Sequence, residues 1–139
     1  MTPEETSAFL AEGIRTAKVA TTARDGGPHV VPVWFVLDGD GIVFTTSESS
    51  VKGRHLLRDD RIALCVDDEA PPFAYVSIRG RAILTREAPD LLAWTTRIAA
   101  RYMGEEQADE YGRRNAVPEE LLVRVTPERT IAKTDVAGW

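Results

Sequence analysis

Polar and apolar positions alternate along much of this chain, and helical spacing is confined to a few stretches. Lys18 to Arg24, Ile42 to Thr46 and Phe73 to Leu84 are rich in β-branched or aromatic residues, which predicts strands. Asp25-Gly26-Gly27 and Asp38-Gly39-Asp40-Gly41 are turn signals that join successive strands as hairpins. The pattern therefore favours an antiparallel sheet.

Helices are expected where the apolar residues take a spacing of three and four. Two of them cover approximately residues 3–13, opened by the capping box of Thr2 and Glu5, and residues 89–103, with 105–115 helical or loose. A short helix with Val51, Leu56 and Leu57 apolar is expected before Asp59. Further strands are expected at His29 to Leu37, Ile62 to Val66, Leu121 to Val125 and Arg129 to Lys133, and Gly80 is a possible bulge. Six or seven strands with few helices exclude an alternating parallel sheet. We predict one domain, 1–139, built as a small antiparallel β-barrel with helices on its outside.

The strand from His29 to Leu37 is apolar on both of its alternations. An antiparallel strand with one solvated face would alternate, so its second face is expected to meet a partner subunit or a planar ligand. Pro32 cannot donate a backbone hydrogen bond, which places this point at an edge, a bulge or a gap that faces a ligand.

A hydroxyl-rich stretch separates the strand Ile42 to Thr46 from the helix that follows it. Its members are Thr45, Thr46, Ser47, Ser49 and Ser50, and Lys52 and Arg54 come directly after them. The first turn of a helix has unpaired N–H groups and a partial positive charge, which together attract a phosphate. We interpret this stretch as a phosphate cradle. The alternative is an ordinary serine N-cap followed by solvated basic residues.

The net charge and the cysteine count limit the classes of ligand and partner that the chain can bind. The net charge of −5 and the isoelectric point near 5.1 oppose nonspecific binding to nucleic acid or to an anionic membrane, which favours a small-molecule ligand. Cys65 is the only cysteine, so no internal disulfide or cysteine metal cluster can form. Neither a signal-peptide pattern nor an apolar run of membrane-spanning length is present, so we expect a cytoplasmic protein. The two histidines are not spaced as metal ligands, and no metal site is predicted.

Several short motifs occur in an order that resembles the pyridoxamine 5′-phosphate oxidase-like split β-barrel superfamily. They are Val19-Ala20-Thr21-Thr22, Gly26-Gly27-Pro28-His29-Val30, Pro32-Val33-Trp34-Phe35, Val43-Phe44-Thr45-Thr46, Ser50-Val51-Lys52-Gly53-Arg54, Leu56-Leu57-Arg58-Asp59-Asp60-Arg61 and Val76-Ser77-Ile78-Arg79-Gly80-Arg81-Ala82. Within that superfamily the chain is most similar to the deazaflavin-dependent oxidoreductases of the B type, which use coenzyme F420. The resemblance covers roughly residues 5–125 and depends on the whole series of motifs.

The resemblance implies a homodimer with two equivalent sites at the subunit interface. It places the cofactor phosphate at Thr45, Thr46, Ser47, Ser50 and Lys52, with Arg54 as a weaker member. It places the cofactor ring along the backbone of Val31, Pro32, Val33 and Trp34, and assigns Phe73 and Tyr75 to the far wall, contributed by the second subunit. Because the cofactor transfers the hydride, no catalytic residue is assigned.

One departure from the family leaves the cofactor open. Several relatives have an arginine shortly before the lysine, where this chain has Ser49, Ser50 and Val51. The acidic tail of F420 would require further positive charge, for which Arg54, Arg58 and Arg79 are candidates. The first alternative is an oxidase or flavin reductase that uses flavin mononucleotide (FMN), and the second is a non-catalytic module that binds a flavin, a deazaflavin or haem. The acceptor, the direction of reaction and the role of residues 134–139 stay open.

Overall fold

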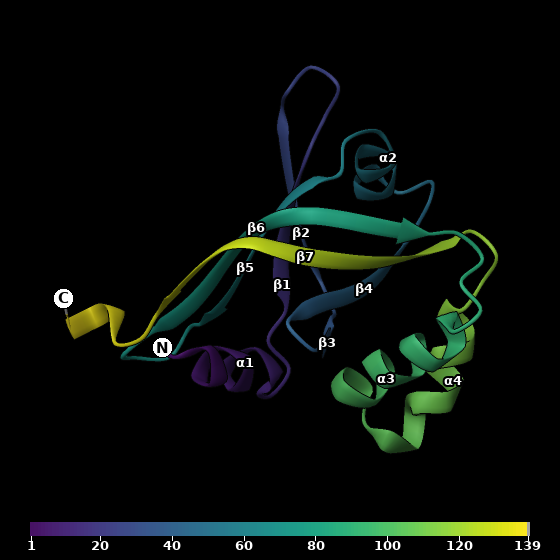
Figure 1. Cartoon of the computed structure of the whole chain (residues 1–139). Helices are drawn as coiled ribbons and strands as arrows, with labels where there is room; N and C mark the ends of the chain where they lie inside the picture. Colours follow the sequence, from purple (N-terminus) through teal and green to yellow (C-terminus); the bar gives the residue numbers. More distant parts are fainter. Residues whose placement is uncertain (139) are drawn as a thin grey trace.

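The computed structural model describes residues 1–138, which form seven strands and four α-helices (Figure 1). The strands are β1 (Ala17–Thr22), β2 (Pro28–Val33), β3 (Val36–Asp38), β4 (Gly41–Ser47), β5 (Arg61–Asp68), β6 (Ala74–Thr85) and β7 (Glu120–Lys133). The helices are α1 (Pro3–Ala11), α2 (Val51–Arg58), α3 (Leu91–Met103) and α4 (Ala108–Asn115), with short 3-10 turns at Glu105–Gln107 and Val136–Gly138. Trp139 lies outside the described residues.

All paired strands are antiparallel, and they follow the order β2-β1-β5-β6-β7-β4-β3 across one sheet. The two edge strands, β2 and β3, are consecutive in the chain. β2 pairs with β1, whereas β3 pairs with β4 at the opposite edge of the sheet. The residues between β2 and β3 therefore link the two edges, and the sheet curls into the split barrel that the sequence predicted.

The prediction of one continuous strand from His29 to Leu37 was wrong, because the strand breaks at Trp34 and Phe35. Helix α3 supplies the hydrogen bonds that a neighbouring strand would otherwise make. The amide of Phe35 donates to the hydroxyl of Tyr102 (3.2 Å), and its carbonyl oxygen accepts from the Arg101 guanidinium (2.8 Å). The break is stable because the backbone groups of a fully buried residue stay paired there.

The prediction of two strands on either side of Pro127 was also wrong, since β7 is one strand of 14 residues. β7 continues because the register of the β6–β7 ladder shifts at Gly80, which pairs with Pro127. A Cβ atom at Gly80 would collide with the carbonyl oxygen of Thr126, so the close approach at this bulge requires glycine. The bulge expected at Gly80 is confirmed.

Two apolar cores hold the helices on the barrel. The main core fills the barrel interior, and its largest fully buried side chains are Phe35, Phe44, Ile42, Leu56 and Leu121. A second core lies between the barrel and α3, and its buried members are Val36, Val43, Ala88, Leu91, Ile98 and Leu122. Helices α3 and α4 pack on each other beyond the ends of β6 and β7 (Figure 1), and the Thr95 hydroxyl donates to the Gly112 carbonyl oxygen (2.8 Å).

Candidate functional site

The turn between β4 and α2 is built around the hydroxyl of Ser50, the N-cap of α2. This oxygen accepts from the Gly53 amide (3.0 Å) and donates to the Ser47 carbonyl oxygen (2.8 Å). It also lies 2.8 Å from the hydroxyl of Thr46. Because a hydroxyl has a single proton, Thr46 must be the donor in that contact. Ser50 and Thr46 therefore shape the turn, and neither has a proton left for a ligand.

Gly53 fixes how closely α2 approaches the end of β4. It is buried, and a Cβ atom there would collide with the carbonyl oxygen of Ser47. The first turn of α2 is therefore pressed against the strand end. In the described part of the chain, the amides of Val51 and Lys52 donate to no protein acceptor, whereas those of Gly53 and Arg54 are bonded to Ser50. Two N–H donors remain for an anion, and the backbone of Val51 is a contributor that the sequence motif did not indicate.

Lys52 adds a full charge beside these amides. Its side chain is half-buried, and among residues 1–138 it makes no hydrogen bond and no ion pair. Burial lowers the pKa of Lys52, and the negative charge of Glu120 opposes that change. The hydroxyls of Ser47 and Ser49 lie at the same turn, 2.9 Å from each other. One of these two hydroxyls donates to the other, which leaves one hydroxyl proton free. An ammonium group, two amides and one hydroxyl form a donor set that suits a phosphate.

The predicted ring-binding residues lie along the split of the barrel. β3 pairs with β4 only from Gly41 to Val43, so the following part of that edge of β4, up to Ser47, has no strand partner within the described residues. The outward edge of β2 is unpaired as well. The family resemblance assigned Val31, Pro32, Val33 and Trp34 to the cofactor ring. The first three lie on β2, which borders the split, and Trp34 directly follows its end.

Trp34 is held by an aromatic stack at the point where β2 ends. Its ring lies 5.0 Å from that of Tyr102 with an interplanar angle of 4°, and the residue is 38% exposed. Tyr102 is fixed in turn, because its hydroxyl donates to the Arg15 carbonyl oxygen (2.7 Å) and accepts from the Phe35 amide. Trp34 is therefore covered on one face and rigidly supported, which suits a wall for a flat ligand.

The two histidines lie at the other end of the split, between α2 and the β1–β2 hairpin. His55 Nδ1 is 2.9 Å from the hydroxyl of buried Thr21, and the His29 ring packs edge-on against His55 at 5.6 Å. His29 Nδ1 is buried without a hydrogen-bond partner. The pKa of His55 is lowered by burial and by the nearby charges of His29, Arg58 and Arg54. The negative charge of Asp25 opposes this change. The sequence showed no sign of this contact between a strand and a helix.

The remaining predicted residues are not gathered at the cradle within one chain. Arg54 is exposed, and Arg58 donates to the Thr22 carbonyl oxygen. Phe73 and Tyr75 lie at the start of β6, where Tyr75 pairs with Asp67, whereas α2 adjoins the opposite end of β5. Their predicted role therefore requires a second copy of the chain.

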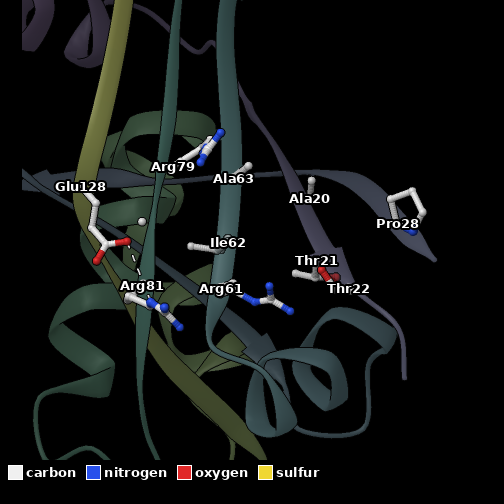
Figure 2. Close-up of a pocket in the computed structure, with 11 residues that line it drawn as sticks. Ala20, Thr21, Thr22, Pro28, Arg61, Ile62, Ala63, Arg79, Arg81 and Glu128 are labelled. Atoms are coloured by element: carbon white, nitrogen blue, oxygen red, sulfur yellow. Dashed lines mark ion pairs between the residues drawn. The ribbon is translucent and has the colours of Figure 1, made fainter. Parts of the chain in front are cut away.

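A separate cavity of about 400 Å³ lies on the outer face of β1, β5 and β6 (Figure 2). Arginines dominate its rim, but two of them are engaged with carboxylates. Arg61 pairs with Asp59 (2.7 Å), and Arg81 pairs with Asp60 (2.7 Å) and Glu128 (3.8 Å). Arg79, which the sequence suggested for an acidic tail, lines this cavity and has no ion pair among the described residues.

A family profile identifies the chain. The profile of pyridoxamine 5′-phosphate oxidase matches residues 2–133, which is nearly the whole sequence. The chain belongs to the pyridoxamine 5′-phosphate oxidase family. The family resemblance read from the order of motifs is therefore confirmed. A search of curated proteins finds no match.

Solved structures agree with the family assignment. A conserved hypothetical protein of Mycobacterium tuberculosis, Rv2991, is 26% identical with a TM-score of 0.84, covering 99% of this chain and 87% of its own. An F420 reductase is 26% identical with a TM-score of 0.69, covering 88% of this chain and 93% of its own. The haem storage protein HutZ of Vibrio cholerae shares the fold at 19% identity, with a TM-score of 0.74 and 94% of each chain covered. An F420 reductase and a haem storage protein therefore share this fold. Among residues 1–138, no helix has the length and apolar character needed to cross a membrane.

Proposed function

We propose that the protein is an F420-dependent reductase, which transfers a hydride between reduced F420 and a small conjugated acceptor. The observation that carries the proposal is the half-buried ammonium of Lys52, which has no ion pair in the described residues and lies beside two free amides at the start of α2. The similarity to an F420 reductase over most of both chains supports the same cofactor.

The residues of the chain have distinct parts in this proposal. Lys52, the first amides of α2 and the hydroxyl pair of Ser47 and Ser49 hold the phosphate, in a turn that Thr46 and Ser50 shape. Thr45, on β4 before this turn, is the remaining member of the hydroxyl-rich stretch. The end of β2 from Val31 to Val33, together with Trp34, borders the ring, and Arg54 adds an exposed positive charge at α2. When bound, the deazaflavin supplies the hydride, so the chain has to orient the ring and exclude water.

We also propose that the site is completed in a cytoplasmic homodimer. Val30, on the outward face of β2, is 63% exposed, and Phe73 is 39% exposed at the start of β6. A second copy would cover this apolar surface and bring Phe73 and Tyr75 to the far wall of the ring. Sedimentation equilibrium at micromolar concentration tests the assembly, and a monomer across the concentration range would contradict it.

The cofactor is tested by titration of the purified protein with F420, FMN and haem. We expect F420 to bind, and we expect Lys52→Ala to weaken it by about 1.5–3 kcal/mol, the size of a hydrogen bond to a charged group. Arg113→Ala is the control, because it removes one positive charge from an exposed position of α4 that is outside the proposed site. If Lys52→Ala binds F420 as tightly as the unmodified protein, the ligand is held elsewhere.

The same titration separates the two alternatives. Protein that prefers FMN and purifies with a flavin spectrum would be an FMN-dependent oxidase or flavin reductase of the family. Protein that binds a cofactor but reduces no member of a broad acceptor panel would be a storage or sensing module, as the name of HutZ indicates for that neighbour.

A further inference from the structure

A carboxylate lies beside the proposed phosphate cradle, and none of the roles above uses it. Glu120 opens β7 and pairs in register with Ser47, the last residue of β4. Directly opposite residues on antiparallel strands have Cβ atoms about 4.5–5.5 Å apart. A hydrogen bond beside this pair fixes the start of β7 against the turn, because the Glu48 amide donates to the Glu119 carbonyl oxygen (2.9 Å). The carboxylate of Glu120 is therefore held at the edge of the turn that carries Lys52.

Glu120 and Lys52 are both half-buried, and the charge of each affects the pKa of the other. Glu120 is half-buried, and its carboxylate makes no ion pair within 4.0 Å among residues 1–138. Burial raises the pKa of Glu120, whereas a hydrogen bond from Thr45 and the charge of Lys52 lower it, and Glu119 raises it slightly. Among residues 1–138, Glu120 is also the one carboxylate whose charge acts on the pKa of Lys52. A ligand phosphate at Lys52 therefore meets one positive and one negative side chain.

The two candidate cofactors differ in the charge of their phosphate. The phosphate of F420 is a diester with one negative charge, whereas that of FMN is a monoester, which carries nearly two negative charges at pH 7. We propose that Glu120 is a specificity-determining residue that offsets the attraction of Lys52 for a second ligand charge, so that the cradle accepts a phosphodiester without losing it to a phosphomonoester. Lys52 attracts the dianion about twice as strongly as the monoanion, and Glu120 repels it more strongly in the same proportion, so the two effects largely cancel. This inference rests on the proposed function.

The test keeps the ring constant and varies only the charge. The ligands are riboflavin, the methyl phosphodiester of riboflavin and FMN, which carry zero, one and nearly two negative charges. We expect Glu120→Gln to leave riboflavin unchanged, to tighten the diester about threefold and to tighten FMN about tenfold, as expected for a partly screened charge. Glu119→Gln is the matched control, because it removes the same charge from the exposed neighbouring residue, and it should change each affinity less than twofold.

A second measurement needs no variant. Lowering the pH from 7.5 to 5.5 protonates the monoester, whose second pKa is about 6. The affinity for FMN should then change little, because the attraction of Lys52 and the repulsion of Glu120 fall together with the ligand charge. If Lys52 alone decided the affinity, the loss of a ligand charge would weaken FMN binding.

Specific outcomes would overturn the proposal. Equal changes in affinity for all three ligands in Glu120→Gln would show a general loosening of the turn. Weaker FMN binding at pH 5.5 would show that Glu120 does not repel the ligand phosphate. If F420 binding depends on Lys52 but the effect of Glu120→Gln does not grow with ligand charge, only the role of Glu120 is refuted and the proposed function stands. If neither F420 nor FMN binds the unmodified protein, the proposed function fails together with this inference.

Discussion

The hydroxyl of Tyr102 offers a direct test of how the barrel break is stabilised. Tyr102→Phe keeps the aromatic ring that stacks on Trp34 but removes the bonds to the Phe35 amide and the Arg15 carbonyl oxygen. Phe35 is fully buried, so its amide would lose its only acceptor without gaining water. The substitution therefore isolates the polar contribution of the contact between α3 and the barrel.

The expected cost follows from these two bonds. A buried amide left without an acceptor costs about 1–3 kcal/mol, and an ordinary hydrogen bond contributes about 0.5–1.5 kcal/mol. We therefore expect Tyr102→Phe to lower the free energy of unfolding by about 2–4 kcal/mol, and the melting temperature by roughly 6–15 °C for a domain of this size. Tyr102→Leu also removes the stack on Trp34, which should cost about 1 kcal/mol more.

Urea denaturation followed by circular dichroism measures the free energy of unfolding in both variants. Tyr111→Phe serves as the control, because the Tyr111 hydroxyl makes no hydrogen bond in the described residues, and its effect should stay within about 0.5 kcal/mol. A loss below about 0.5 kcal/mol in Tyr102→Phe would refute the reasoning, since the break at Phe35 would then be stable without its partner from α3.

Two further predictions concern α2. Gly53→Ala should destabilise the protein by about 1–3 kcal/mol in urea denaturation, because the added Cβ collides with the Ser47 carbonyl oxygen, and an unchanged midpoint would show that α2 can move away freely. The pKa of His55 is lowered from its ordinary value of 6.5, so the unfolded chain binds the proton more tightly and stability falls as the pH drops through this region. His55→Asn can keep the hydrogen bond to Thr21 without titrating, so its melting temperature should depend less on pH between 7 and 5. Identical pH profiles for the variant and the unmodified protein would contradict this.

Local sequence patterns were enough to predict the hairpins, the barrel and the serine cap before Lys52. Alternation and turn residues act between neighbours in the chain, and the serine cap lies within three residues of the amide that it binds. Contacts between residues that are far apart in the sequence leave no such pattern in it. The stack of Trp34 on Tyr102 and the approach of Glu120 to the cradle depend on the packing of α3 and on the β4–β7 register. For the same reason, the break at Phe35 was missed.

The segment between β6 and β7, which contains α3 and α4, is a place where the sequence and length of this fold can vary. Both of its ends emerge from one long antiparallel ladder, so exchanging or lengthening the segment leaves the pairing of the barrel strands intact. Yet this segment carries Tyr102, which backs the indole at the barrel split. Changes of length or sequence there would remodel the surface beside Trp34 while the turn at Lys52 stayed constant. If the proposed function holds, an engineer seeking new acceptors should randomise this excursion, keep Arg101 and Tyr102, and leave the strands alone.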